Sequence, residues 1–171
     1  ASSNTVTIET NDKNDKVEVT LKDVNIDTSS RKKAAVSVTG EGDTNIKLDG
    51  DNALKSDIYR SGIYGSGSGS LTISGGENDS LTAQGGSGAN GISSSGSLTI
   101  SGGTVTANGD DGGHGIYSRG GVTISGGSTV TANGRSGTIS GGDGIRSDGG
   151  VTISGGTVNA TGGNGGTISG G

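Results

Sequence analysis

A phrase that recurs at a nearly constant spacing places the strongest constraint on the fold of this 171-residue chain. An apolar residue followed by Thr-Ile-Ser-Gly-Gly occurs at residues 71–76, 98–103, 122–127 and 151–156. Each copy is preceded by a Gly-Ile pair and followed by a second alternating segment, at 81–83, 105–107, 130–132 and 158–160. Each period thus contains three short alternating segments, and self-similarity of this kind is the signature of a repeat architecture.

The same rhythm extends more weakly toward the N-terminus. Alternating segments at 19–21, 24–26 and 36–38 form an earlier period, the segment 46–48 opens the next one, and a lead segment occupies 6–8. The first segments of successive periods then start at 19, 46, 71, 98, 122 and 151, which gives spacings of 24 to 29 residues.

These segments predict a stacked fold. Alternation of apolar and polar residues over three to five positions is typical of a strand with one buried face. A unit of three such strands cannot bury its apolar face alone, so neighbouring units must stack to form a continuous core. We therefore expect one all-β domain, a right-handed parallel β-helix of about six coils with 24–29 residues and three short strands per coil.

The predicted core consists of columns of aliphatic residues, one residue per coil. In the regular part of the chain they are Leu71, Leu98, Val122 and Val151; Ile73, Ile100, Ile124 and Ile153; Leu81, Val105, Val130 and Val158; Ala83, Ala107, Ala132 and Ala160; and Ile63, Ile92, Ile116 and Ile145. We expect glycine at the corners between strands because it adopts positive φ in tight turns.

Composition divides the chain and excludes several classes of protein. Residues 1–60 contain all seven lysines and only three of the 39 glycines, so they are predicted to be charged capping coils, while 61–171 form the Gly/Ser-rich regular coils. The absence of cysteine excludes disulfides and thiolate metal sites. The net charge of −5 with few aromatic residues argues against nucleic acid as a partner, and no apolar run is long enough to span a membrane.

The last residues resemble the start of another coil. Residues 166–171 repeat residues 137–142, but the Asp-Gly-Ile that continues the earlier copy is not present after Gly171. This pattern is consistent with further coils or with a layer supplied by another copy of the chain. A structural subunit of a bacterial surface fibre or adhesin stalk, built by end-to-end stacking, is therefore one functional alternative.

The sequence contains little that indicates catalysis, and we expect the protein not to be an enzyme. The single histidine, His114, precedes a Gly-Ile pair at a position where other coils have Ser61, Asn90 and Asp143. This variable position predicts a solvated turn residue. No Gly-x-Ser-x-Gly elbow is present, and the Gly-rich segments do not lead into helices, as a phosphate-binding loop requires.

Carboxylates in the turns are candidate ligands for calcium, which prefers several oxygen donors. The candidates for metal binding are Asp110, Asp111, Asp143 and Asp148. The chain matches neither an EF-hand loop nor the Gly-Gly-x-Gly-x-Asp calcium repeat. The same carboxylates are also explained as solvated turn residues.

The position after each Gly-Ile pair predicts a ligand-binding surface. It is occupied by Tyr64, Ser93, Tyr117 and Arg146 in successive coils, so these residues should form one outward line. Arg119, Tyr59 and Arg60 lie next to this line in the sequence. A tyrosine ring stacks on a sugar, and an arginine pairs with a carboxylate through two hydrogen bonds. The line is therefore a candidate site for an acidic polysaccharide.

A second surface provides a minor alternative. The outward positions of the second segment are Ser80 and Thr82, Thr104 and Thr106, Thr129 and Thr131, and Thr157 and Asn159. A flat Thr-x-Thr ladder of this kind is typical of an ice-binding solenoid, although threonine is also a good strand residue.

The chain resembles a family of secreted β-helical proteins of clostridial species that are described as carbohydrate-binding. The resemblance covers residues 16–160 and rests on 17–26 (VEVTLKDVNI), on 34–38 (AAVSV) and on the repeated Gly-Ile-x-Ser-x-Gly-x-apolar-Thr-Ile-x-Gly-Gly-Thr phrase. It implies a secreted or cell-surface bacterial protein that binds acidic plant polysaccharide, notably polygalacturonate, with calcium and without hydrolytic activity. The family has Asp or Asn before Gly-Ile, which Asp143 and Asn90 match and His114 and Ser61 do not.

Overall fold

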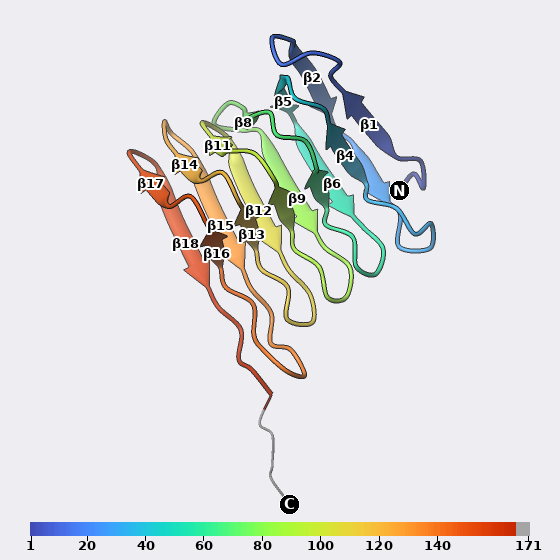
Figure 1. Cartoon of the computed structure of the whole chain (residues 1–171), viewed down its shortest axis with the longest axis vertical. Coiled ribbons are helices and arrows are strands. Elements are labelled where there is room, and N and C mark those ends of the chain that lie inside the picture. Colours follow the sequence, from blue (N-terminus) through green and yellow to red (C-terminus); the bar gives the residue numbers. More distant parts are fainter. Residues whose placement is uncertain (167–171) are drawn as a thin grey trace, which may run out of the picture.

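The computed structural model describes residues 1–166, and within that range the chain is all-β with no helix. Its eighteen strands form three parallel sheets of six strands each. The chain visits the three sheets in turn, so each coil contributes one strand to every sheet, and the coils stack along one axis (Figure 1). The predicted β-helix of six coils with three strands per coil is thereby confirmed.

The strands of each sheet follow one another in sequence order. The first sheet consists of β1 (Val6–Glu9), β4 (Val36–Thr39), β7 (Ile63–Gly65), β10 (Ile92–Ser94), β13 (Ile116–Ser118) and β16 (Ile145–Ser147). The second sheet consists of β2 (Lys16–Lys22), β5 (Asp43–Asp49), β8 (Leu71–Ser74), β11 (Leu98–Ile100), β14 (Val122–Ile124) and β17 (Val151–Ile153). The third sheet consists of β3 (Asn25–Asp27), β6 (Asp51–Lys55), β9 (Ser80–Gln84), β12 (Thr104–Asn108), β15 (Thr129–Asn133) and β18 (Thr157–Thr161).

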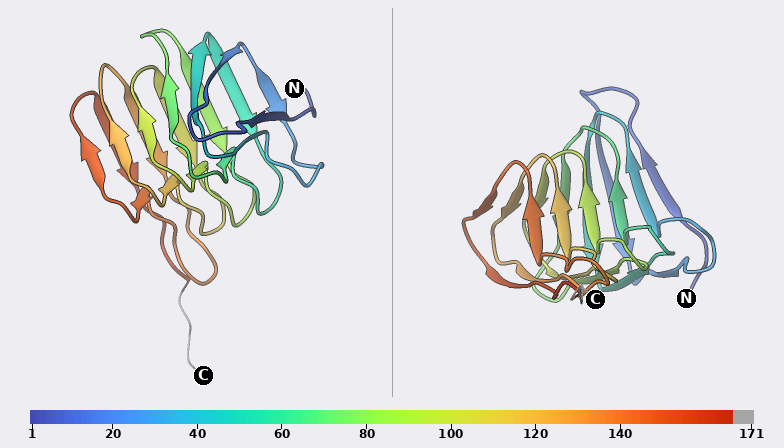
Figure 2. Two further views of the ribbon diagram at one scale, coloured as in Figure 1. Left: turned by 45° about the horizontal axis from the view of Figure 1, so that its top comes forward. Right: turned by 60° about the horizontal axis from the view of Figure 1, so that its bottom comes forward.

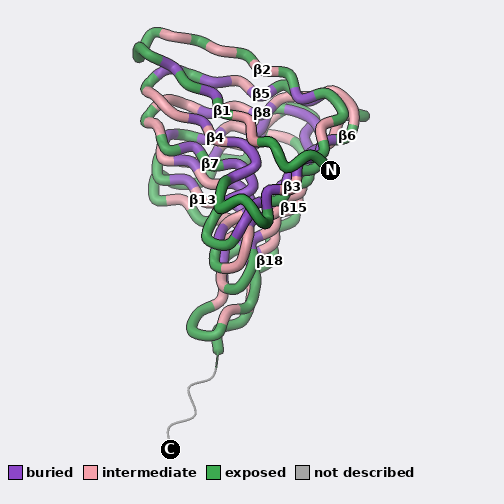
Figure 3. Tube along the Cα trace, turned by 90° about the vertical axis from the view of Figure 1, so that its right-hand side faces the viewer, coloured by how far each residue is buried: buried purple, intermediate pink, exposed green. Residues whose placement is uncertain are grey.

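The pairing register confirms the predicted core columns. In the second sheet, Ile100 pairs with Ile73 on one side and with Ile124 on the other, and Ile124 pairs with Ile153. The first three of these isoleucines are completely buried, whereas Ile153 is 53% exposed. Ile153 belongs to the last coil that the structure describes, where no further strand lies on that edge of the sheet within residues 1–166. Figure 3 shows buried residues in the middle of the stack and mostly exposed residues in its last coil, near β18.

Two of the columns contain a polar residue in the second coil. Thr44 pairs with Leu71, and Asn52 pairs with Leu81. Both are buried, but Asn52 Oδ1 accepts a hydrogen bond from the backbone N–H of Val24 at 2.9 Å, whereas Thr44 Oγ1 has no partner. The strand that contains Asn52, β6, is absent from the sequence analysis because this residue interrupts the alternating apolar pattern.

Glycine is needed at the Gly-Ile corners for a reason other than positive φ. Positive φ is confirmed at other corners between strands, for example at Gly103, Gly121 and Gly156, but Gly62, Gly91, Gly115 and Gly144 do not have it. A Cβ added to Gly91 would lie 2.5 Å from the backbone nitrogen of Asn108, and one added to Gly115 would lie 2.5 Å from that of Asn133. In these four coils, only glycine allows the start of the first-sheet strand to approach the end of the third-sheet strand this closely.

The N-terminal residues lie against the first coil. The backbone N–H of Ser2 donates to the carbonyl oxygen of Asn25, and the N–H of Asp27 donates to the carbonyl oxygen of Ser2, both at 2.8 Å. Ser2 therefore covers part of the outer edge of β3. Figure 2 shows the N-terminus and the C-terminal coil at opposite ends of the stack.

Candidate functional site

The outward line that was predicted after the Gly-Ile pairs exists on the first sheet. Tyr64 pairs with Ser93, Ser93 with Tyr117, and Tyr117 with Arg146. The same register extends to Ser37 and Thr7 in the first coils. We call this line, Thr7, Ser37, Tyr64, Ser93, Tyr117 and Arg146, the tyrosine column. Neighbouring positions in it are about 4.8 Å apart, which is the spacing of paired strands.

Tyr64 lies between two hollows. The first has a volume of about 230 Å³ and is lined by Tyr59, Arg60, Ser61, Tyr64, Gly88, Ala89, Asn90 and Ser93. The second has a volume of about 270 Å³ and is lined by Thr5, Thr7, Lys32, Lys33, Ala34, Ser37, Arg60 and Tyr64. Because Arg60 and Tyr64 line both hollows, a ligand that crosses the Tyr64 ring can occupy both at once.

Lys32 and Lys33 were missed by the sequence analysis. They lie in the connection between β3 and β4, whose sequence is not repeated in the equivalent connections of the later coils, such as residues 56–62 and 85–91. The signal that could have identified them is their position just ahead of the segment 34–38 (AAVSV), since Ser37 is in register with Tyr64. They add positive charge beside the tyrosine that the sequence had indicated.

Tyr117 differs from Tyr64 in its surroundings. Its hydroxyl donates a hydrogen bond to Asp148 Oδ2 at 2.9 Å, and its ring centroid lies 5.9 Å from that of His114. Arg146 Nη1 lies 3.8 Å from Asp143 Oδ2. The C-terminal half of the tyrosine column therefore contains two carboxylates, and the cationic half is the one around Tyr64.

The remaining predicted residues are placed at the margins of the column. Tyr59 is 72% exposed, and its backbone N–H donates to the carbonyl oxygen of Ser87 at 2.9 Å. Arg119 follows β13 in an exposed turn, where its backbone N–H donates to the carbonyl oxygen of Ser94 at 3.0 Å. Tyr59 and Arg60 thus line a hollow beside Tyr64, whereas Arg119 lines none of the hollows described here.

His114 connects neighbouring coils and is not a fully solvated turn residue. Its backbone N–H donates to Asn90 Oδ1 at 2.9 Å, and its Nδ1 accepts from the backbone N–H of Asp143 at 2.8 Å. Its side chain is only 20% exposed. The expectation of a solvated residue is therefore wrong, because this column of turn residues passes hydrogen bonds from coil to coil.

Burial is the main cause that lowers the pKa of His114 below its usual value of 6.5; Asp143 opposes this shift, and Arg146 adds to it. The neutral ring that accepts from Asp143 is thus favoured in the folded state. Its contribution to stability is present above pH 6.5 and is lost as the pH falls through the folded-state pKa, because the unfolded chain binds the proton more readily.

We expect the melting temperature of the wild type to fall on acidification from pH 6.5 to about pH 5 more steeply than that of His114→Asn. Asparagine is the matched control because Asn90 makes the equivalent hydrogen bond in the preceding coil. NMR titration of the single histidine measures its pKa directly. A midpoint at or above 6.5 would contradict this assignment.

The four predicted calcium ligands do not converge. The Asp143 carboxylate lies near Arg146 and the Asp148 carboxylate accepts from the Tyr117 hydroxyl, while Asp111 Oδ2 accepts from Ser87 Oγ at 3.4 Å. Asp110 lines a separate hollow of about 560 Å³ that also contains Arg135 and Lys55. Within residues 1–166, no group of three or more His, Asp or Glu side chains is placed to hold a metal ion. Calcium binding stays a prediction.

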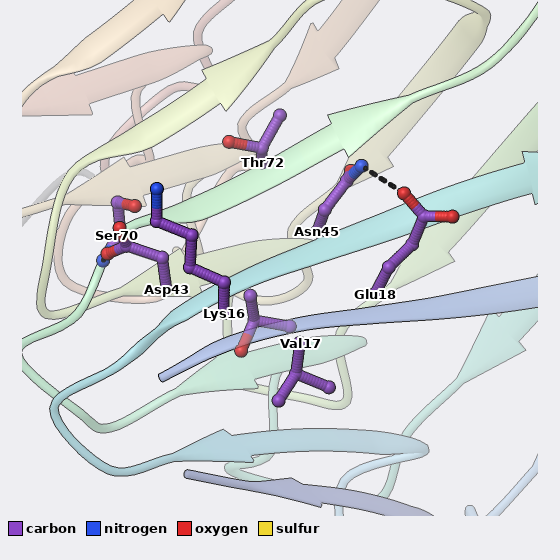
Figure 4. Close-up of a pocket in the computed structure, with 8 residues that line it drawn as sticks. Lys16, Val17, Glu18, Asp43, Asn45, Ser70 and Thr72 are labelled. Carbon is purple, nitrogen blue, oxygen red and sulfur yellow. Dashed lines mark hydrogen bonds between the residues drawn. The ribbon is translucent and has the colours of Figure 1, made fainter. Parts of the chain in front are cut away.

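The second sheet carries a further hollow of about 320 Å³, lined by Lys16, Val17, Glu18, Asp43, Thr44, Asn45, Ser70 and Thr72. Figure 4 shows Asn45 beside Glu18, to which its Nδ2 donates at 3.2 Å. Asp43 Oδ1 accepts from the backbone N–H of Ser70 at 3.1 Å. Hydrogen bonding by the Ser70 side chain, and secondly by this N–H, lowers the pKa of Asp43. Two carboxylates against one lysine make this hollow a poor match for an acidic ligand.

The two surfaces considered as alternatives are exposed on the structure, and ice binding and end-to-end stacking both stay predictions. Thr82, Thr106 and Thr131 are in register on the third sheet, and a comparable line on the second sheet consists of Thr72, Thr99, Thr123 and Thr152. In the last described coil, Val151 is 45% exposed and Ile153 is 53% exposed. The repeat that begins at Gly166 falls on 167–171, outside the described residues.

Comparisons with known proteins add no identification. No family model matches the chain, and no curated protein and no solved structure matches it either. The resemblance to secreted carbohydrate-binding proteins therefore stays a prediction. Within residues 1–166, no helix has the length and hydropathy needed to cross a membrane.

Proposed function

We propose that this protein is a non-catalytic, extracellular binding protein that recognises an acidic polysaccharide along the tyrosine column. The observation that carries the proposal is the arrangement at Tyr64, where one exposed aromatic ring and Arg60 are shared by two adjoining hollows. An aromatic ring next to a guanidinium group suits a sugar that carries a carboxylate, because the ring packs on the sugar face and the guanidinium pairs with the charge.

The repeat explains why the ligand is a polymer. The column offers outward side chains at every coil, about 4.8 Å apart, along a straight line parallel to the solenoid axis. Tyr64 and Tyr117 are separated by two coils, or about 9.6 Å, a spacing that suits alternate sugars of an extended chain. Asp143 and Asp148 add negative charge beside Tyr117 and Arg146. We therefore expect an acidic ligand to bind more strongly in the half of the column around Tyr64.

Calorimetry with polygalacturonate, with and without a chelator, tests this proposal. We expect Tyr64→Ala and Arg60→Gln each to weaken binding about ten-fold, which corresponds to about 1.4 kcal/mol. Tyr117→Ala should have a smaller effect, because its hydroxyl and part of its ring already contact Asp148 and His114. Thr99→Ala on the second sheet is the control and should bind like the wild type.

Equal affinity of Tyr64→Ala, Arg60→Gln and the wild type would show that the column is not the binding surface. Loss of binding on chelation would add a metal to the site, and unchanged binding would show that a metal is not needed.

A further inference from the structure

The connection between β3 and β4 carries three consecutive cations, Arg31, Lys32 and Lys33, and all three are exposed. Lys32 has a φ of +54°, and Tyr59, across the hollows, has a φ of +59°. They are two of only four non-glycine residues with positive φ in the described part of the chain. Such a conformation is costly for a residue with a side chain and persists only where its surroundings impose it.

A buried carboxylate imposes this geometry. Asp57 is 8% exposed, and its Oδ2 accepts from the backbone N–H of Lys32 while its Oδ1 accepts from that of Ile58 at 2.7 Å. The carbonyl oxygen of Asp57 also accepts from the backbone N–H of Arg60 at 2.9 Å. One side chain thus ties the lysine loop to the turn that carries Tyr59 and Arg60.

Further contacts fix the same loop. The buried Thr28 donates from Oγ1 to the carbonyl oxygen of Lys33 at 2.7 Å, and Arg60 Nε lies 3.4 Å from the carbonyl oxygen of Lys32. The backbone N–H of Ala35 donates to the buried Ser56 Oγ at 2.8 Å. The backbone is therefore held at both ends of the lysine pair, while the ammonium groups are left on the surface beside Tyr64.

We propose that Lys32, Lys33 and Arg60 form a preorganised subsite for the anionic group of a sugar, a carboxylate or a sulfate, whose ring lies on Tyr64. Asp57 is the positioning residue, because it holds the two backbone segments that present these cations. The inference rests on the proposed polysaccharide function and specifies which part of the column recognises charge. The subsite also explains why a lysine, Lys32, occupies a position of positive φ, where glycine would be sufficient for folding.

The test compares Lys32→Gln, Lys33→Gln, Lys32→Gly and Asp57→Asn with the wild type, using polygalacturonate, its methyl ester and dextran sulfate as probes. Lys47→Gln, which removes the same charge from an exposed position on the second sheet, is the matched control. Affinity is measured over a range of salt concentrations, because pairing with exposed cations is screened by salt.

We expect each lysine substitution to weaken binding of the acidic probe about two- to five-fold and to reduce its salt dependence. Lys32→Gly should do so with an unchanged or higher melting temperature, since glycine accepts positive φ without strain. Asp57→Asn should likewise reduce the salt dependence of the affinity for the acidic probe. Simple destabilisation of the folded state would not produce this change. Lys47→Gln should match the wild type.

The outcomes separate the subsite from the proposed function. If polygalacturonate binds, Tyr64→Ala weakens it and the lysine variants bind like the wild type, the subsite is wrong and the function stands. If dextran sulfate binds in a lysine-dependent manner and polygalacturonate does not, the subsite stands with sulfate as its anion and the uronate ligand is wrong. If neither polymer binds, both proposals are overturned.

Discussion

Replacing Gly115 with alanine is expected to destabilise the protein by about 1–3 kcal/mol, as overpacked sites do. The added Cβ would lie 2.5 Å from the backbone nitrogen of Asn133 and 2.8 Å from the carbonyl carbon of Ala132. Both atoms belong to the main chain of β15, so a rotamer change cannot relieve the contact. The free energy of unfolding from chemical denaturation measures the effect.

Gly127→Ala is the matched control for this substitution. Gly127 has no positive φ, and an added Cβ there meets no heavy atom within 4 Å. We expect it to be neutral or to stabilise slightly, because alanine restricts the unfolded chain. Equal stability of the two variants would contradict the close approach of the first and third sheets at the corner.

Ile100→Ala is expected to lower the free energy of unfolding by about 2–5 kcal/mol, the usual range for a buried large-to-small substitution. Ile100 is completely buried between Ile73 and Ile124 in the adjacent coils. Its truncation leaves a cavity in the middle of the column, where the sheet on either side prevents collapse. Denaturant unfolding with a comparison of m-values measures the loss.

Ile153→Ala provides the control within the same column. It removes the same atoms from a side chain that is already 53% exposed, so the expected cost is well below that of Ile100→Ala. Similar costs for the two substitutions would indicate that Ile153 is covered in solution, for example by a further coil. A small cost for both would contradict the burial of the central column.

How far the sequence predicts this fold depends on how closely each coil repeats the others. From residue 71 onward the phrases are nearly identical, so aligning them gives the register of Leu98 with Val122 directly. The second coil replaces column residues with Thr44 and Asn52, whose inward position depends on hydrogen bonds or on stacking against the next coil. Pattern alone does not identify a polar residue as part of a core.

In the candidate site, too, the repeat predicts some features and not others. The line of Tyr64, Ser93, Tyr117 and Arg146 follows from the repeat, because one register places all four. The contact of Lys32 with Asp57 joins residues 25 positions apart through the backbone of an irregular loop, and no periodicity encodes it. The pairing of Tyr117 with Asp148 likewise links a strand to a turn of the next coil.

The stacking register, on which the core and the tyrosine column both depend, is tested most directly by cysteine pairs, since the chain has no natural cysteine. Thr99 and Thr123 are register partners on adjacent parallel strands, where the Cα atoms are about 4.8 Å apart and within the range of a disulfide. Ser125 lies two residues further along, beyond that range.

We expect mild oxidation of Thr99→Cys with Thr123→Cys to give an intramolecular disulfide in high yield, and Thr99→Cys with Ser125→Cys to give little. Peptide mass spectrometry after proteolysis distinguishes the two. Equal yields, or a higher yield for the second pair, would contradict the register and with it the alignment of Tyr64 with the rest of its column.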